Sequence, residues 1–255
     1  MHRRAAVLLL LVAPTACATP PVTLQHRFEP GASRVYRVEV ETDTVIDAGG
    51  IDRTERETLQ AESRLDVLET GAAGATVRLT ITPERRTLDG EVVAAPAAQS
   101  AEVVIAPDGT VREVRRIGGL TPEVAGTDPD ELIALLGPPL PQGRVRVAQR
   151  WRTPLPDGGE QRGRVRSLRV VDGYDCAIVV LGTARRLERV RRAGGATVRL
   201  AGTETAATEI AFAFRDGFPV EVTTDAEARM QVLAGAVTGG DVVITTHTEI
   251  RLVQP

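Results

Sequence analysis

The sequence predicts a mainly β protein, an antiparallel meander that forms a strongly curved sheet or incomplete barrel with one short helix. Polar and apolar residues alternate over about ten stretches, the pattern of half-buried antiparallel strands. Turn pairs rich in Gly and Asp separate these stretches, and a single segment carries helical spacing. A flat sheet of that many strands tends to curl. We therefore expect one curved sheet, with a two-sheet β-sandwich as the alternative.

The first strand is expected at 34–45, where Tyr36, Val38 and Val40 share one face and charged residues occupy the other. A hairpin is expected around the turn Pro107-Asp108-Gly109, since this composition is typical of a tight turn. The other strands of the first half are expected at 57–69, 75–82, 102–106 and 110–116.

The helix is expected at 128–136. Asp128 suits the N-cap, Pro129 the first helical position, and Glu131 completes a capping box. Its apolar face is formed by Leu132, Ile133, Leu135 and Leu136. A proline-rich segment follows and leads to Trp151, the single tryptophan, so we expect the helix and this segment to lie over the concave face or mouth of the sheet.

Alternation returns in the second half of the chain. Strands are expected at 164–173, 176–187, 197–214, 218–230 and 241–253. The similarity between APDGTVREVRR and FRDGFPVEVTTD suggests that one domain, 28–255, consists of two related halves. These halves would be residues 28–120 and 145–255, joined by the helix and proline segment 128–142.

The first residues have the order of an export signal: two arginines, a short apolar run and a small residue before Cys17. We expect a signal peptide at 1–16, a lipid on Cys17 and a tether over 17–27. The protein would then be exported and anchored to the outer face of the cell membrane, or to an outer membrane where the host has one. Cleavage before Thr19 is the alternative and would release a soluble, secreted protein.

Two stretches, HRFEPGASRVYRVEVETDT and LGPPLPQGRVRVAQRW, carry a family resemblance. With the Cys17 motif they resemble an uncharacterised family of exported bacterial lipoproteins, whose first strand opens with Phe-x-Pro-Gly and whose Pro-Pro-Leu-Pro segment precedes a Trp. The expected architecture is more distantly similar to lipid-carrier lipoproteins, whose curved sheet holds acyl chains under a helical lid. The resemblance implies export and anchorage, and no activity.

No pattern of catalytic or metal-binding residues stands out, so we expect a non-enzymatic protein without a metal or other cofactor. The chain has three histidines, too few and too far apart in the sequence for a zinc site, and His247 is expected to be a polar strand residue. Cys176 shares its face with Ile178 and Val180 and is expected to be a small core residue. The formal net charge of −3 argues against a nucleic-acid partner.

Two functions remain open. The first is a carrier that binds a lipid or other apolar ligand in a cavity of the sheet, with Leu132, Ile133, Leu135, Leu136 and Trp151 at the cavity or its lid. The second is a structural or adhesion module of the cell envelope with a filled core. An apolar cavity of several hundred Å³ under the helix would favour the carrier, and a completely filled concave side would favour the module.

One charge asymmetry bears on partners. Residues 144–199 contain 14 arginines against five acidic residues. Such a segment suits anionic lipid headgroups or an acidic envelope polymer. Arginines on outer strand faces and hairpin ends also keep a large sheet soluble, which is the simpler interpretation.

Overall fold

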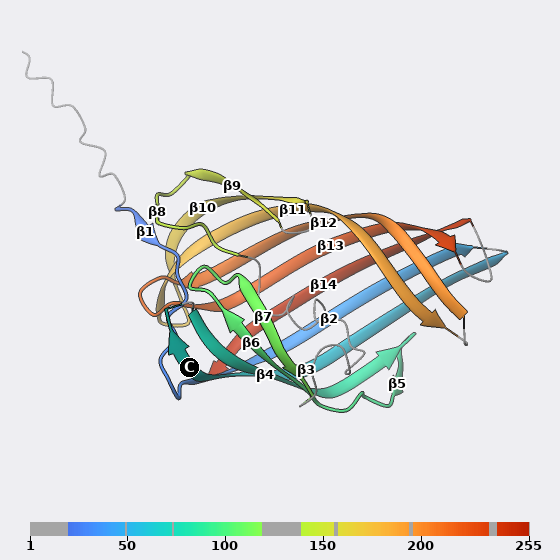
Figure 1. Ribbon diagram of the computed structural model, residues 1–255, viewed down its shortest axis with the longest axis horizontal. Helices are drawn as coiled ribbons and strands as arrows, with labels where there is room; N and C mark the ends of the chain where they lie inside the picture. The colour runs from blue at the N-terminus through green and yellow to red at the C-terminus, as the bar shows by residue number, and fades with distance from the viewer. Residues whose placement is uncertain are drawn as a thin grey trace, which may run out of the picture.

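The computed structural model describes residues 20–48, 50–72, 74–118, 139–155, 158–193, 196–234 and 239–254. Its dominant feature is one strongly curved, antiparallel sheet of twelve strands (Figure 1). The predicted fold class is therefore correct, and the described strands form a single large sheet rather than a sandwich. The predicted helix at 128–136, with its four apolar residues, and Cys17 lie outside the described residues.

The sheet has two arms that meet at its centre, where β2 (Ser33–Ala48) pairs with β14 (Gly240–Gln254). One arm continues from β2 through β3 (Ile51–Gly71), β4 (Gly74–Leu88), β6 (Gln99–Ile105) and β7 (Val111–Ile117), with β5 (Glu91–Val93) on β4. The other continues from β14 through β13 (Phe218–Ala234), β12 (Ala196–Ala213), β11 (Tyr174–Ala193), β10 (Glu160–Val171) and β9 (Arg150–Pro154). The sheet is open, and β7 and β9 are its two edges.

The two arms correspond to the two ends of the chain. Consecutive strands pair with each other within each arm, as the expected meander requires, except that β5 and β6 both pair with β4. The link between the arms is the pairing of the first and last long strands, for example Val38 with Ile250. A further short ribbon, β1 (Val22–Thr23) with β8 (Arg144–Val145), lies beside the second arm (Figure 1).

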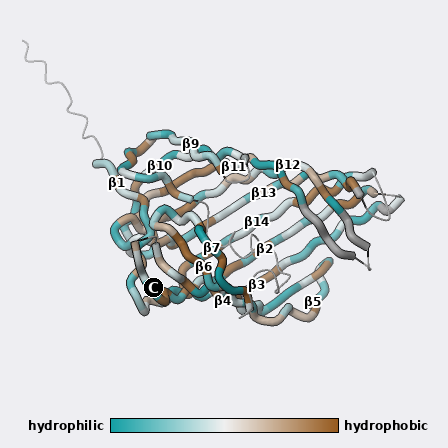
Figure 2. The backbone as a smooth tube through the Cα atoms, viewed as in Figure 1, coloured by the Kyte–Doolittle hydropathy of each residue, from teal (hydrophilic) through white to brown (hydrophobic). Residues whose placement is uncertain are grey.

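Alternation along the strands assigns their two faces, as the sequence predicted. Tyr36 and Val38 of β2 are buried on the inner face, while Asp43 and Val45 are exposed on the outer face. The same alternation of hydrophilic and hydrophobic residues is visible along the other strands in Figure 2. The turns also follow prediction: Asp172 and Gly173 both have positive φ, 49° and 85°, as a two-residue hairpin turn requires.

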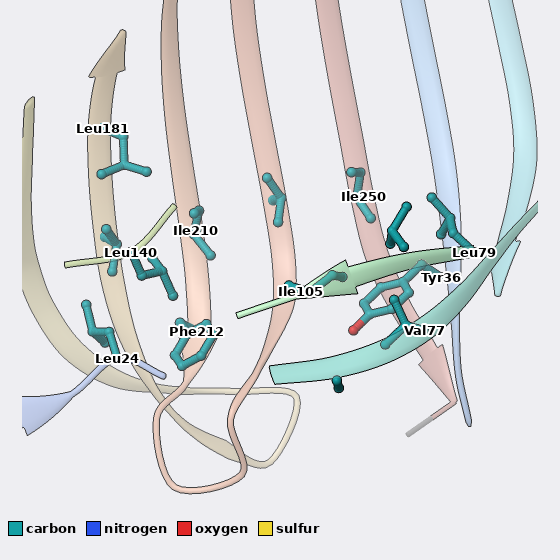
Figure 3. Close-up of a cluster of buried hydrophobic side chains, with 14 of the residues drawn as sticks. Leu24, Tyr36, Val77, Leu79, Ile105, Leu140, Leu181, Ile210, Phe212 and Ile250 are labelled. Carbon is teal, nitrogen blue, oxygen red and sulfur yellow. The ribbon is translucent and has the colours of Figure 1, made fainter. Parts of the chain in front are cut away.

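The main core fills one end of the curved sheet, here called the base, where the turns at Asp172-Gly173 and Asp216-Gly217 lie (Figure 3). Leu79 of β4 and Leu181 of β11 belong to this one cluster although their strands are far apart in the sheet. Side chains from both arms therefore face each other across the curve. Phe212 and Leu24 are among its fully buried members, and each such side chain contributes about 1.5–3 kcal/mol by burial.

The predicted tether over 17–27 is wrong for its second half. Val22 and Thr23 form β1, and Leu24 is fully buried in the main core. His26 is also packed, with its ring 5.3 Å from that of Phe212. The sequence did not reveal this strand because Val22 and Leu24, two apolar residues at a spacing of two, are too short a pattern. Its partner strand β8 also lies more than a hundred residues later in the chain.

Candidate ligand-binding site

The inner face continues well beyond the main core. We call this part the trough, meaning the inner face of β2 and β11–β14 between the base and the far hairpin end at Gly50 and Gly239. Its middle is lined mostly by threonine and alanine, with Thr183, Ala206, Ala226, Thr246 and Thr42 in one row across five neighbouring strands. All five side chains are only half-buried. The described part of the chain leaves this surface open.

An apolar cluster closes the far end of the trough. Met230 is 2% exposed and packs with Val232 and Val242. Gly202 of β12 makes this packing possible, because a Cβ there would lie 1.9 Å from the Arg229 carbonyl oxygen. The half-buried residues Ile46, Leu187, Leu200 and Ile244 pack against the cluster.

The enclosed space at the base is small. A cavity of about 40 Å³ lies between the inner face and two covering segments, residues 24–28 and the β6–β7 turn. Its lining includes four polar side chains, those of His26, Arg34, Tyr36 and Ser63. The cavity of several hundred Å³ that would have favoured the carrier is therefore not enclosed by the described residues, and any larger site must lie in the open trough.

Arg34 is the unusual residue of this cavity. It lies on the apolar face of β2 and is only 8% exposed. One guanidinium nitrogen donates to the Arg27 carbonyl oxygen at 3.3 Å, and the group stands 4.6 Å from the Phe218 ring centre. No carboxylate of the described residues lies within ion-pair distance of it.

The neighbours of Arg34 are held in neutral form. Burial, with a smaller contribution from Arg34, lowers the pKa of His26 to about 4. Burial also raises the pKa of Tyr36 above its ordinary value. At neutral pH the cavity therefore holds one cation, a neutral imidazole and two hydroxyl groups.

Trp151, a predicted cavity residue, packs against the main core at the base. It stands over Gly163, where a Cβ would lie 2.4 Å from its ring. Among the described residues its Nε1 is buried without a hydrogen-bond partner, as is Oε1 of Gln161 on the neighbouring strand. Gln161 Nε2 donates to the Pro139 carbonyl oxygen at 2.6 Å, which ties the proline segment to the sheet.

The connection between the two sheet edges begins and ends in the interior. Ile117 closes β7 and is 3% exposed, and the described chain resumes at Pro139 and Leu140, the latter also 3% exposed. Leu140 lies beside Leu24, Phe212 and Leu181 (Figure 3). Ile117 and Leu140 are thus both on the concave side of the sheet.

A second, open groove lies at the base, beside β1. Its volume is about 730 Å³, and four exposed arginines line it: Arg27, Arg144, Arg169 and Arg215. Asp175 is its acidic residue and lies 3.2 Å from Arg215. The structure therefore brings two arginines of the basic segment 144–199 together with two from outside it.

The remaining titratable candidates are structural. Cys176 is buried and free, and burial raises its pKa to about 11, as expected for a core thiol. His247 lies on the outer face, with Nδ1 2.7 Å from Asp225, and that hydrogen bond raises its pKa. Within the described residues no three metal-ligating side chains gather, and no helix has the length and apolar character to cross a bilayer.

Sequence analysis missed Arg34 and His26. A signal was present for Arg34, because it shares the parity of Tyr36 and Val38 and so had to point into the core. No comparable local signal existed for His26, whose surroundings come from β6, β7 and β12.

Comparisons with known proteins find two solved structures with distant similarity to this chain. No protein-family model and no curated protein matches it. A structure described as lipid–protein interactions in lipovitellin matches with 11% identity and a TM-score of 0.48, over 89% of this chain and 26% of that one. The chain thus spans about a quarter of the lipovitellin chain. An outer membrane channel from Pseudomonas putida F1 matches with 13% identity and a TM-score of 0.27, over 94% of this chain and 99% of the channel.

Proposed function

We propose that the protein is a non-enzymatic, exported carrier, anchored by a lipid on Cys17, that holds an acyl chain or similar apolar ligand in the trough. The observation that carries the proposal is the open trough, a half-buried threonine and alanine surface that lies between the filled base and the apolar far cluster.

We propose the predicted helix at 128–136, which lies outside the described residues, as the lid of this site, with its four leucine and isoleucine residues as the apolar side. A helix with one apolar face buries that face against another apolar surface. An acyl chain between the helix and the trough would be shielded on both sides, which is the usual form of a site for an apolar ligand.

The arginine groove supports anchorage at the same end of the molecule. Pro20 and Pro21 line this groove, and Cys17 precedes Pro20 by three residues. Three extended residues span at most about 11 Å, so a lipid on Cys17 would hold the four arginines close to the bilayer. Near an anionic membrane surface each arginine contributes about 1 kcal/mol.

Substitution in the middle of the trough tests the carrier. Ala206 lies on the inner face between Thr183 and Ala226, and the adjacent Ala207 is exposed on the outer face. We expect Ala206→Trp to reduce the affinity for 1-hexadecanol by at least about tenfold, the equivalent of two buried methylene groups. Ala207→Trp is the matched control and should bind as the parent does, with both measured by calorimetric titration.

The alternative is a structural or adhesion module of the envelope. Its supporting observation is the filled base, where Leu140 and Trp151 occupy the interior and the enclosed space is about 40 Å³. The same titration separates the two functions. A parent protein that binds no 1-hexadecanol, and that carries no lipid by native mass spectrometry when purified from its host, would overturn the carrier in favour of the module.

A further inference from the structure

We propose that the cavity around Arg34 is a carboxylate-binding pocket, which takes the head of a fatty-acid-like ligand whose chain lies in the trough. The inference rests on the proposed carrier function and names its ligand class. It is carried by a buried guanidinium that has no acidic partner within the described part of the chain, at the base of the surface proposed to hold the acyl chain.

A buried and unpaired cation is costly. Taking a charge out of water costs several kcal/mol unless it gains an opposite charge or full hydrogen bonding. The ordinary partner of a buried arginine is a carboxylate. Arg34 is 8% exposed, and the described residues provide it with one carbonyl oxygen, that of Arg27, and the face of Phe218. Most of its five N–H donors are thus left for a ligand.

Asp108, an acidic neighbour of His26, already accepts two hydrogen bonds. Asp108 lies on the β6–β7 turn near His26, and its Oδ1 accepts from the Thr110 backbone N–H at 3.0 Å. Its Oδ2 accepts from Gln142 Nε2 at 3.1 Å. Because these bonds hold the Asp108 carboxylate on its own turn, it does not neutralise Arg34.

The other polar groups of the cavity are also suited to an anion. The hydroxyl groups of Tyr36 and Ser63 line the same space, and both residues are buried, at 7% and 4% exposure. Neither hydroxyl has a hydrogen-bond partner among the described side chains. Each can donate to a carboxylate oxygen, and the neutral imidazole of His26 does not repel an anion.

The size of the cavity favours a carboxylate over a larger headgroup. A volume of about 40 Å³ holds roughly three water molecules, each of which needs about 10–15 Å³ of such space. A planar carboxylate fits this space and matches the fork of a guanidinium with two parallel hydrogen bonds. A phosphodiester with its substituents does not fit.

The walls of the cavity continue into the trough. Val222 and Ile250 line the cavity, and the next inner-face residues on the same strands, Thr224 and Thr248, belong to the trough. From Val222 to Met230 the strand extends eight residues, roughly 26 Å at 3.3 Å per residue. One leaflet of bilayer hydrocarbon is about 15 Å thick, so a long acyl chain can lie between the pocket and the far cluster.

The test compares two ligands that share a chain and differ in the head. Hexadecanoate and 1-hexadecanol are titrated into the full-length protein at pH 8 by calorimetry, with Arg34→Gln, Arg34→Lys and Tyr36→Phe as variants. We expect the parent to prefer hexadecanoate by about 10- to 100-fold, the range for a hydrogen-bonded charge. Arg34→Gln should abolish this preference. Arg34→Lys should keep part of it, and Tyr36→Phe should lower it severalfold.

Each outcome has a distinct meaning. A parent that binds both ligands equally overturns the carboxylate pocket and leaves the carrier standing. A parent that binds neither overturns the carrier as well. If circular dichroism shows that Arg34→Gln is unfolded, Tyr36→Phe and Ser63→Ala test the pocket instead, because neither removes a charge. An unchanged preference for hexadecanoate in both variants overturns the pocket.

Discussion

His26 illustrates how a single residue depends on its tertiary surroundings. Its imidazole stacks on Phe28, contacts Phe212 edge to face, and lies half-buried near Arg34 and Asp108. These surroundings lower its pKa from 6.5 to about 4. At neutral pH the neutral ring packs against Phe28 and Phe212, while protonation would place a second cation near Arg34.

The stability of the fold should therefore fall as the pH decreases from about 6.5 to about 4. In this window the unfolded chain binds a proton at His26 and the folded protein does not, so acid favours unfolding. The decrease in the free energy of unfolding approaches about 3 kcal/mol at pH 4. In urea denaturation, His26→Phe should flatten this part of the pH profile.

His247 is the control for that measurement. Its pKa is raised by Asp225 and Glu249, so it stabilises the fold at low pH and loses that effect as the pH rises through its folded pKa. His247→Gln should leave the decrease between pH 6.5 and 4 in place. A profile that is unchanged in His26→Phe would show that His26 is protonated in the folded protein.

At the scale of elements, two glycines on neighbouring strands test the packing of the far cluster. A Cβ on Gly202 of β12 would meet the Arg229 backbone, whereas one on Gly182 of β11 would meet nothing within 4 Å. We expect Gly202→Ala to lower the free energy of unfolding by about 1–3 kcal/mol, as overpacking does. Gly182→Ala should be neutral or slightly stabilising. Equal effects in urea denaturation would contradict the close approach of β12 and β13.

The strands also show where pattern reading succeeds and where it fails. Alternation predicted the inner face of β2 correctly, because strand parity is a local property of residues two apart. β1 and its pairing with β8 were missed, because a two-residue strand has no pattern and its stability comes from Leu24 inserting into a core made by other segments. The helix at 128–136 stays a prediction.

For the whole molecule, orientation at a membrane is the testable property. The arginine groove lies beside the start of the described chain, so the base should face an anionic bilayer. In flotation assays with Cys17→Ser protein, we expect binding to vesicles containing phosphatidylglycerol that weakens with salt. Arg169→Gln and Arg215→Gln should each reduce it about fivefold.

Arg229→Gln is the matched control, since Arg229 is equally exposed but lies toward the far end of β13. A reduction as large as that of the groove variants would contradict the orientation.

Labelling with a palmitate analogue tests the anchor itself. The parent should be labelled and Cys17→Ser should not, and equal labelling of both would refute lipidation at Cys17.

The sequence by itself determined the class of fold, the faces of the long strands and the positions of most turns, because these depend on the spacing of neighbouring residues. Only the tertiary structure decided that β2 and β14 join the two arms, that the base is filled, and that Arg34, His26, Tyr36 and Ser63 line one cavity. The reason is geometric. Strand parity states which way a side chain points, whereas the curvature of the sheet and the segments that cover it decide what that side chain meets.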